Sequence, residues 1–181
     1  MEMRKVLVIG SGGAGKSTFA RRLGKLLHLE VIHLDALYWN AGWIETPKPE
    51  WAKRVAELAA REAWIMDGNY SGTFDIRLKA CDVVVFLDMP RLLCLWRVLK
   101  RSMIYRNRSR PDMGAGCPEK FDRDFLDFLL WVWNYPKRTR PKIIAWMREN
   151  AGSKKVVRLR SPVEVERYLA DVSKSSSIIE R

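Results

Sequence analysis

Cysteine and histidine are scarce in this sequence, which holds three cysteines and two histidines in 181 residues. Cys81, Cys94 and Cys117 are odd in number and widely separated, and no CxxC pair occurs. A structural zinc site needs closely spaced Cys or His ligands, and a secreted disulfide scaffold needs a dense, even set. The sequence argues against both, and we expect three small, mostly buried thiols.

Long apolar runs are also lacking. The run that ends at Ile9 is short and leads directly into glycine and serine, and the longest other run covers residues 128–133. A membrane span needs about 20 apolar residues, and a signal peptide needs an apolar core of about 7–15. We therefore expect a cytoplasmic protein that does not associate with a membrane.

Acidic residues are outnumbered, because 21 Asp and Glu face 33 Lys and Arg and leave a net charge of +12. Such a balance favours anionic partners, so nucleotides and nucleic acid are both candidates. The length and the hydrophobic content of 48% are typical of one folded domain. We expect that domain over residues 1–172 and a frayed C-terminal tail over residues 173–181, where three consecutive serines occur.

Short apolar segments alternate with segments of helical periodicity. The expected strands are residues 5–9, 29–34, 64–66, 83–87 and 155–159. The expected helices are 17–27, one that begins near Pro49, 90–105, 121–134, 142–149 and 162–172. This order predicts βαβ units. The predicted fold class is α/β, with three layers around a five-stranded parallel sheet and functional residues at the carboxyl ends of its strands.

The strongest motif lies directly after the first expected strand. Residues 10–17 read GSGGAGKS and satisfy GxxxxGK[ST], in the strand–turn–helix context that the motif requires. Glycines let successive backbone N–H groups point at phosphate oxygens, Lys16 can reach the β- and γ-phosphates, and Ser17 can bind Mg²⁺. The motif predicts a P-loop NTPase fold that uses ATP and Mg²⁺. The residues predicted to bind the nucleotide are Gly10, Ser11, Gly12, Gly13, Ala14, Gly15, Lys16, Ser17 and Thr18.

The same glycines permit a second interpretation. Gly10, Gly12 and Gly15 satisfy GxGxxG, and Asp35 follows at the spacing of a ribose-binding carboxylate in dinucleotide-binding folds. That interpretation gives no reason for Lys16 and Ser17 to follow the last glycine. The P-loop is therefore the favoured prediction.

Three aspartates stand at expected strand ends. Asp67, in an Asp-Gly pair, follows the third strand, and Asp88 follows the fourth. A carboxylate there can hold Mg²⁺ through its water shell, and we favour Asp67 over Asp88 for this role. Asp35 follows the second strand, where it can orient or deprotonate a substrate hydroxyl. Turn formation or helix capping is the alternative role for each aspartate.

Two stretches are rich in cations. Residues 97–110 contain six Lys and Arg and no acidic residue, and a second run covers residues 137–142. Arg97 and Arg101 are one helical turn apart, and planar guanidinium groups stabilise the charge on a transferring phosphoryl group. A solvated basic face is the alternative. Tyr38, Trp39 and Trp43, which follow Asp35, are suited to stack on a flat acceptor ring.

Together these motifs resemble the small P-loop kinases of the adenylate kinase type over about residues 4–170. The shared order is the P-loop, Asp35, Asp67-Gly68, and then a strand, Pro90 and a helix. The resemblance implies that Arg97 and Arg101, seven and eleven positions after Pro90, are catalytic residues of a helical lid over about residues 97–141.

The same resemblance implies that the loop holding Arg160 wraps the adenine. It also exposes two departures from the group. Shikimate- and gluconate-type kinases carry Asp-x-Asp where this chain has His33-Leu34-Asp35. The arginine that usually follows the Asp-Gly pair is displaced here to Arg77, which leaves its role open.

Four longer segments are similar to the FlaR-like proteins, often labelled DNA topology modulation proteins. The segments are HLDALYW (33–39), DGNYSGTFDIRL (67–78), RPDMGAGCPEKFD (110–122) and WNYPKRTRP (133–141). That label does not name a biochemical activity. The similarity therefore supports the kinase fold more than it supports a role on DNA.

Two functions remain open at this stage. The first is an ATP- and Mg²⁺-dependent phosphotransferase that moves the γ-phosphoryl group to a small hydroxyl- or phosphate-bearing acceptor, such as a nucleoside or nucleotide. Its catalytic residues would be Lys16, Asp35, Arg97 and Arg101. The second is an ATP-binding, DNA-associated regulator that uses the P-loop as a switch. The sequence does not determine the acceptor or the choice between ATP and GTP, and it is compatible with a monomer or a homodimer.

Overall fold

A strand of consecutive apolar residues forms the centre of the sheet. The computed structural model describes residues 3–110, 112–149 and 154–179, and β1 (Lys5–Gly10) lies between β5 (Trp64–Asp67) and β6 (Val83–Leu87). β2 (Val31–His33) and β7 (Lys155–Leu159) complete the order β2-β5-β1-β6-β7, in which every pairing is parallel. The predicted five-stranded parallel sheet is confirmed.

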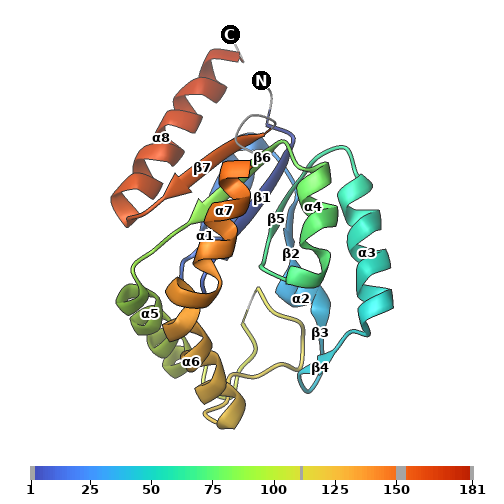
Figure 1. Ribbon diagram of the computed structural model, residues 1–181, viewed down its shortest axis with the longest axis vertical. Helices are drawn as coiled ribbons and strands as arrows, with labels where there is room; N and C mark the ends of the chain where they lie inside the picture. The colour runs from blue at the N-terminus through green and yellow to red at the C-terminus, as the bar shows by residue number, and fades with distance from the viewer. Residues whose placement is uncertain (1–2, 111, 150–153, 180–181) are drawn as a thin grey trace.

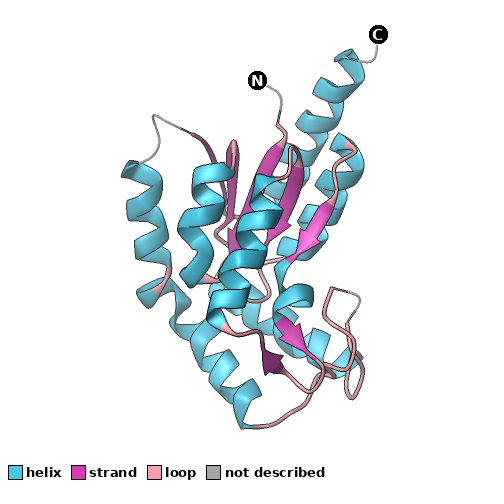
Figure 2. Ribbon diagram, turned by 90° about the vertical axis from the view of Figure 1, so that its right-hand side faces the viewer, coloured by secondary structure: helices cyan, strands magenta, loops and turns pink. Residues whose placement is uncertain are grey.

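Helices pack on both faces of this sheet and give the predicted three layers (Figure 1; Figure 2). α1 (Lys16–Leu27) and α8 (Pro162–Ile179) cover the face that holds Val6 and Val8 of β1. α3 (Lys48–Ala60), α4 (Phe74–Ala80) and α7 (Arg140–Glu149) cover the face that holds Leu7 and Ile9. Successive residues of the strand alternate between two cores, as pleated geometry requires, and all four are fully buried.

The segment predicted as a lid lies beyond the carboxyl end of the sheet (Figure 1). α5 (Arg91–Ile104) packs against α6 (Arg123–Arg138), and residues 105–110 and 112–122 between them are called the lid loop here. The lid loop reaches the short hairpin of β3 (Trp39–Asn40) and β4 (Ile44–Glu45). The N–H of Gly42 donates to the carbonyl oxygen of Gly116 at 2.8 Å, and Nε1 of Trp43 donates to that of Pro118 at 2.9 Å. The loop and the hairpin therefore meet beyond the strand ends.

The structure differs from the sequence predictions mainly in the connections. β2 is shorter than expected because Leu34 and Asp35 already belong to a short helix, α2 (Leu34–Tyr38). The hairpin, a single turn of 3₁₀-helix over Ser71–Thr73 and α4 were not predicted at all. α6 begins at Arg123, where Asp122 caps it by accepting from the N–H of Phe125, and it continues through Pro136.

The last helix corrects the prediction for the C-terminus. α8 continues to Ile179, so the part of the predicted tail from residue 173 to 179 is helical and not frayed. Residues 180–181 of that tail lie outside the described residues. None of the helices within the described ranges is both long and apolar enough to cross a membrane.

A buried arginine organises the chain after β5. Arg77 of α4 is fully buried and donates to the carbonyl oxygens of Gly68 at 2.9 Å, Asn69 at 2.6 Å, Tyr70 at 2.8 Å and Thr73 at 3.3 Å. Burial lowers the pKa of its guanidinium to about 10, so the group is still a cation at neutral pH. The role that the sequence left open for Arg77 is thus to hold the backbone of residues 68–73 in place.

We predict that Arg77→Met lowers the free energy of unfolding by about 3 kcal/mol or more, because the carbonyl groups of residues 68–70 lose a buried, charged donor. Chemical denaturation measures this loss. Arg61→Ala is the control, since Arg61 pairs with Glu30 at the surface with its side chain 49% exposed, and it should change stability by less than about 1 kcal/mol. Equal losses in the two variants would contradict the structural role of Arg77.

Candidate active site

The loop between β1 and α1 has the conformation that a P-loop needs. Gly15 is the N-terminal cap of α1 with φ 95°, and Gly13 has φ 74°, both in the left-handed region that favours glycine. A Cβ atom on Gly13 would lie 2.2 Å from the carbonyl oxygen of Cys94 in α5. The strand–loop–helix context of the GxxxxGKS motif is confirmed, and the loop packs directly on the lid.

Lys16 folds back over this loop. Its Nζ donates to the carbonyl oxygens of Gly10 at 3.1 Å and Ser11 at 3.0 Å. Burial lowers the pKa of Lys16, while the carboxylates of Asp35 and Asp67 act in the opposite direction. The ammonium group therefore lies where two of the predicted carboxylates can reach it electrostatically.

A cavity of about 680 Å³ opens beside the loop, a size that suits a small-molecule ligand. Its wall is shared by P-loop and α1 residues Gly12–Thr18, by Asp35 of α2, and by lid residues from α5 and the lid loop. Those lid residues are Arg97, Arg101, Tyr105, Arg110 and Asp112. Gly10, Ser11 and Asp67 do not line the cavity; the first two contribute through their carbonyl contacts to Lys16.

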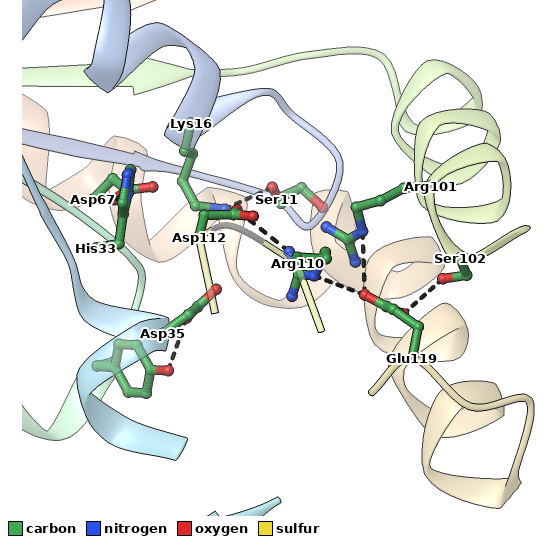
Figure 3. A network of polar contacts seen from close by, with 11 residues as sticks. Ser11, Lys16, His33, Asp35, Asp67, Arg101, Ser102, Arg110, Asp112 and Glu119 are labelled. Carbon is green, nitrogen blue, oxygen red and sulfur yellow. Dashed lines mark hydrogen bonds and ion pairs between the residues drawn. The ribbon is translucent and has the colours of Figure 1, made fainter. Parts of the chain in front are cut away.

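Three arginines of the lid line this cavity, two of them predicted. Nη1 of Arg97 donates to the carbonyl oxygen of Ala14 in the P-loop at 3.3 Å. Nε of Arg101 lies 3.5 Å from the buried carboxylate of Glu119, and Nε of Arg110 lies 2.7 Å from the same oxygen (Figure 3). Burial, and then the charge of Arg110, lower the pKa of Arg101. The structure thus brings Arg97 and Arg101 to the P-loop, as the sequence predicted, and adds Arg110.

Asp67 ends β5 and is held by a histidine. Its Oδ1 lies 2.5 Å from Nδ1 of His33, the last residue of β2, and only 4% of Asp67 is exposed (Figure 3). The hydrogen bond that the ring of His33 makes to the carboxylate of Asp67 raises the pKa of His33 against the opposing effect of burial. His33 stands where shikimate- and gluconate-type kinases carry the first Asp of Asp-x-Asp, and here it fixes a carboxylate rather than supplying one.

Asp88, the competing candidate for the metal, has different partners. Nε of Arg140 lies 2.8 Å from its Oδ1, and the guanidinium of Arg158 contacts its Oδ2 at 2.5 and 2.9 Å. The side chain of Asp88 is 7% exposed. It therefore links β6, β7 and the start of α7 through two ion pairs.

The residues that follow Asp67 position two parts of the site. Asn69 pairs with both backbone groups of Gly10, donating to its oxygen at 2.8 Å and accepting from its nitrogen at 3.3 Å. The phenol of Tyr70 donates to Oδ1 of Asp35 at 2.7 Å. Sequence reasoning did not single out Asn69, Tyr70 or Asp112, and it included Arg110 only as a member of the basic run over residues 97–110. The signal for the other three was that they fall within the quoted segments DGNYSGTFDIRL and RPDMGAGCPEKFD.

The loop after β7 meets the cavity differently from the prediction. Arg160 is exposed, its N–H donates to Oε2 of Glu164 at 2.8 Å, and it is not part of the cavity wall. Pro162, which ends the predicted loop of residues 160–162, does line the cavity, together with Val165 and Glu166 of α8. Of the predicted loop, Pro162 therefore reaches the cavity and Arg160 does not.

A second cavity of about 600 Å³ lies between the hairpin and the lid. Trp39, Trp43 and Glu45 line one side, and Asp124 and Phe125 of α6 line another. Arg101, Arg110 and Phe128 belong to both cavities. The two arginines therefore stand between the P-loop and a space walled by the predicted tryptophans.

The basic runs divide between this site and the surface. In the first run, Arg97, Arg101 and Arg110 line the cavity, whereas Lys100, Arg106 and Arg108 are exposed. In the second run, Arg140 pairs with Asp88, whereas Lys137, Arg138 and Lys142 are exposed. Within the described residues, no three His, Cys, Asp or Glu side chains are grouped so that they could hold a metal by themselves.

Comparison with known proteins assigns the fold. A sugar kinase of Janibacter sp. HTCC2649, in an unliganded structure, aligns with a TM-score of 0.51 and 19% identity over 96% of this chain and 98% of its own. A deoxyadenosine kinase from M. mycoides with bound dCTP aligns with a TM-score of 0.44 and 13% identity over 93% and 98%. The second similarity is too weak to add to the argument. The chain has a P-loop kinase fold.

No protein-family model and no curated protein sequence matches the chain. The similarity to the FlaR-like proteins therefore stays a prediction.

We predict that Asp88→Asn lowers the free energy of unfolding by about 3 kcal/mol, because Arg140 and Arg158 would be left without a counter-charge. Glu166→Gln is the control, since Glu166 pairs with Arg22 at the surface with its side chain 62% exposed, and it should cost less than about 1 kcal/mol. Thermal or chemical unfolding reports both values. A loss for Asp88→Asn no larger than that of the control would contradict a structural role for Asp88.

Proposed function

We propose that this chain is an ATP- and Mg²⁺-dependent phosphotransferase, a kinase, that transfers the γ-phosphoryl group to a small acceptor bearing a hydroxyl or a phosphate. One observation carries the proposal. Lys16 of the P-loop, Asp35 of α2, and Arg97 and Arg101 of the lid line a single cavity. A P-loop by itself accounts only for nucleotide binding. A lysine, a carboxylate and lid arginines around one cavity are the groups that enzymes use to transfer a phosphoryl group. The fold shared with a sugar kinase supports the same class of chemistry.

The cations around the cavity would act on the phosphates. Lys16 would exchange the carbonyl oxygens of Gly10 and Ser11 for the β- and γ-phosphates. Arg97 and Arg101 would stabilise the charge on the equatorial oxygens of the transferring group. Because both arginines come from the lid, their closure would also exclude water, and hydrolysis is the competing reaction.

The oxygen donors near the P-loop fit Mg²⁺. In phosphoryl-transfer sites this ion takes one or two protein oxygens and completes its shell with phosphates and water. Ser17 carries its hydroxyl in the first turn of α1. The carboxylate of Asp67 is held by His33 and lies within electrostatic reach of Lys16. These two residues would hold the ion, since Asp88 is already paired with two arginines. Bound Mg²⁺ would neutralise charge on the β- and γ-phosphates.

Asp35 would receive the acceptor. Tyr70 donates to one of its carboxylate oxygens, which leaves the other to accept a proton or a hydrogen bond from an acceptor hydroxyl. Burial and the neighbouring Asp35 raise the pKa of Tyr70, so the phenol stays protonated and keeps donating. The second cavity shares Arg101 and Arg110 with the first. Its tryptophans, Trp39 and Trp43, would offer aromatic walls to the rest of the acceptor.

The adenine would lie at the other end of the first cavity. Pro162 and Val165 of α8 and Phe19 of α1 supply apolar surface there. Arg22 and Glu166, which pair with each other through two contacts, stand at the same end. We assign the base to Phe19, Pro162 and Val165 because they add apolar surface to a cavity wall that is otherwise rich in cations and P-loop backbone.

The second candidate is an ATP-binding regulator that associates with DNA. The observation in its favour is the set of exposed cations on the lid and on α6 and α7: Lys100, Arg106, Arg108, Lys137, Arg138 and Lys142. Arg97, Arg101, Arg110 and Arg140 already have partners or face the cavity, so a smaller part of the +12 charge is available to DNA than the sequence suggested.

We predict that Lys16→Ala leaves the fold intact and lowers ATP turnover at least about 100-fold, because a preorganised charge on the transferring group is lost. The rate of ADP formation, with circular dichroism as the check on folding, measures this. Lys25→Ala, in the last turn of the same helix, should keep the parent rate. Unchanged turnover in Lys16→Ala would contradict the assignment of the P-loop.

We predict that Arg97→Ala and Arg101→Ala each lower kcat by about 10³-fold, the lower end of the range for an arginine on a transferring phosphoryl group. The matched control is Lys100→Ala on the same helix, whose ammonium lies over the ring of Trp96 at 5.0 Å and faces away from the cavity. Steady-state kinetics at saturating ATP separates kcat from KM. Losses confined to the KM of ATP would contradict a role for the two arginines in the transferring step.

DNA binding, if it is a function, should depend steeply on salt. Each neutralised phosphate adds about 0.9 to the slope of log K against log salt, so several contacts would weaken binding by orders of magnitude between 50 and 200 mM. Fluorescence anisotropy with a short duplex measures that slope. The kinase proposal predicts no binding at physiological salt, and measurable binding there that ATP modulates would favour the regulator.

A further inference from the structure

The lid loop brings a carboxylate to the P-loop. Asp112 lines the same cavity as Lys16 and Ser17, and its side chain is 16% exposed. Oδ2 of Asp112 lies 3.4 Å from Nη1 of Arg110 (Figure 3). Burial disfavours its ionised form, but Arg110 and a hydrogen bond from the hydroxyl of Ser17 outweigh burial and lower the pKa of Asp112. Asp112 thus brings a carboxylate from the lid loop into the cavity that Ser17, the residue expected to bind Mg²⁺, also lines.

The lid loop holds Asp112 from both sides. Before it, the N–H of Asn107 donates to the carbonyl oxygen of Glu119 at 3.0 Å. After it, Cys117 donates through Sγ to the carbonyl oxygen of Asn40 at 3.1 Å, and Gly116 accepts from Gly42 of the hairpin. A hydrogen bond within the lid loop and contacts to the hairpin therefore fix where this carboxylate lies.

A carboxylate in this position would repel the triphosphate of a bound nucleotide. Two anions in contact repel each other strongly at low dielectric unless a cation lies between them. Arg110 alone does not supply the cation needed between Asp112 and a phosphate, because its Nε already pairs with Glu119 at 2.7 Å. The same region already holds Asp67, and both Asp67 and Asp112 act electrostatically on His33. Asp67 lies within electrostatic reach of Lys16, and Asp112 shares a cavity with Ser17, so both carboxylates are near the P-loop, where the triphosphate would carry its metal.

We propose that Asp112 is a third oxygen ligand, with Ser17 and Asp67, for the Mg²⁺ that accompanies the nucleotide, and that the lid loop delivers it. This inference rests on the proposed function. Ser17 and Asp67 belong to the body of the domain, whereas Asp112 belongs to the lid loop. Metal binding would therefore tie the lid to the P-loop, and the same carboxylate would disfavour nucleotide that arrives without a metal.

The test is equilibrium binding of a non-hydrolysable ATP analogue by calorimetry, once with Mg²⁺ and once with EDTA. Asp112→Asn keeps the shape of the side chain and removes its charge. It should weaken binding of the Mg²⁺-loaded analogue at least about tenfold, the loss seen when a partner of a metal site is removed. Binding of the metal-free analogue should stay equal or become tighter, because a repelling charge is gone.

Asp127→Asn is the matched control, because Asp127 of α6 also belongs to the lid but is exposed and lines neither of the two cavities. It should change neither binding constant. Chemical denaturation of both variants excludes unfolding as the cause of any loss.

A third variant separates coordination from charge in general. Asp112→Cys should restore tight binding of the analogue with Cd²⁺, which prefers sulfur, but not with Mg²⁺. Asp112→Asn should show no such rescue by Cd²⁺.

Three outcomes would overturn the inference. Tighter binding of Asp112→Asn in both conditions would make Asp112 a carboxylate that only repels phosphate. Equal weakening in both would make it a structural support of the loop, and no change in either would remove it from the site. If the unaltered chain binds no analogue in either condition, the proposed function itself fails.

Discussion

The backbone of the P-loop lies directly against the first turn of α5, and this contact determines where the lid can stand. A side chain at Gly13 would collide with the carbonyl oxygen of Cys94, and one at Gly10 would lie 2.6 Å from that of Leu87. Because α5 cannot move away without opening this packing, Arg97, less than one turn beyond Cys94, is held over the loop and donates to Ala14. The P-loop and Arg97, the first of the two arginines proposed to act in catalysis, are thus one packed unit.

Charge balance in the lid depends on this arrangement. Glu119 is 5% exposed and could not be buried as an anion without partners, which Arg101, Arg110 and Ser102 provide. In return, Glu119 holds the two guanidinium groups between the cavities before any ligand arrives. An anionic group that enters must compete with Glu119 for them. A phosphoryl group that is being transferred could compete well with Glu119, because its charge is spread over several oxygens that can pair with planar guanidinium groups.

The sequence predicted those parts of the molecule whose signals are local. GSGGAGKS, the strand over Val83–Leu87 and the pair Arg97 and Arg101 each depend on spacing within a few residues. The structure bears out the P-loop context and the sheet. What escaped prediction depends on contacts between distant segments. Arg77 interrupts the apolar pattern of α4 because it is buried for its hydrogen bonds, and no periodicity marks such a residue.

The aspartates illustrate the same limit. Asp67 and Asp88 are equivalent as strand-end carboxylates, and only their partners distinguish them: His33 for one, Arg140 and Arg158 for the other. Those partners lie 34 to 70 residues away along the chain. Asp112 was harder still to predict, because the loop that carries it has neither strand nor helix periodicity. Its position near Ser17 depends on how that loop packs against the hairpin.

The central claim is that the cavity transfers a phosphoryl group and does not merely bind or hydrolyse a nucleotide. The most direct measurement follows the label from γ-³²P-ATP with Mg²⁺ in the presence of separate pools of nucleosides, nucleotides, sugars and 5′-hydroxyl oligonucleotides, with Lys16→Ala as the blank. The account predicts that label appears on the members of one pool and that this transfer is absent from the blank. Release of inorganic phosphate that no pool changes, or that only DNA stimulates without becoming labelled, would contradict it.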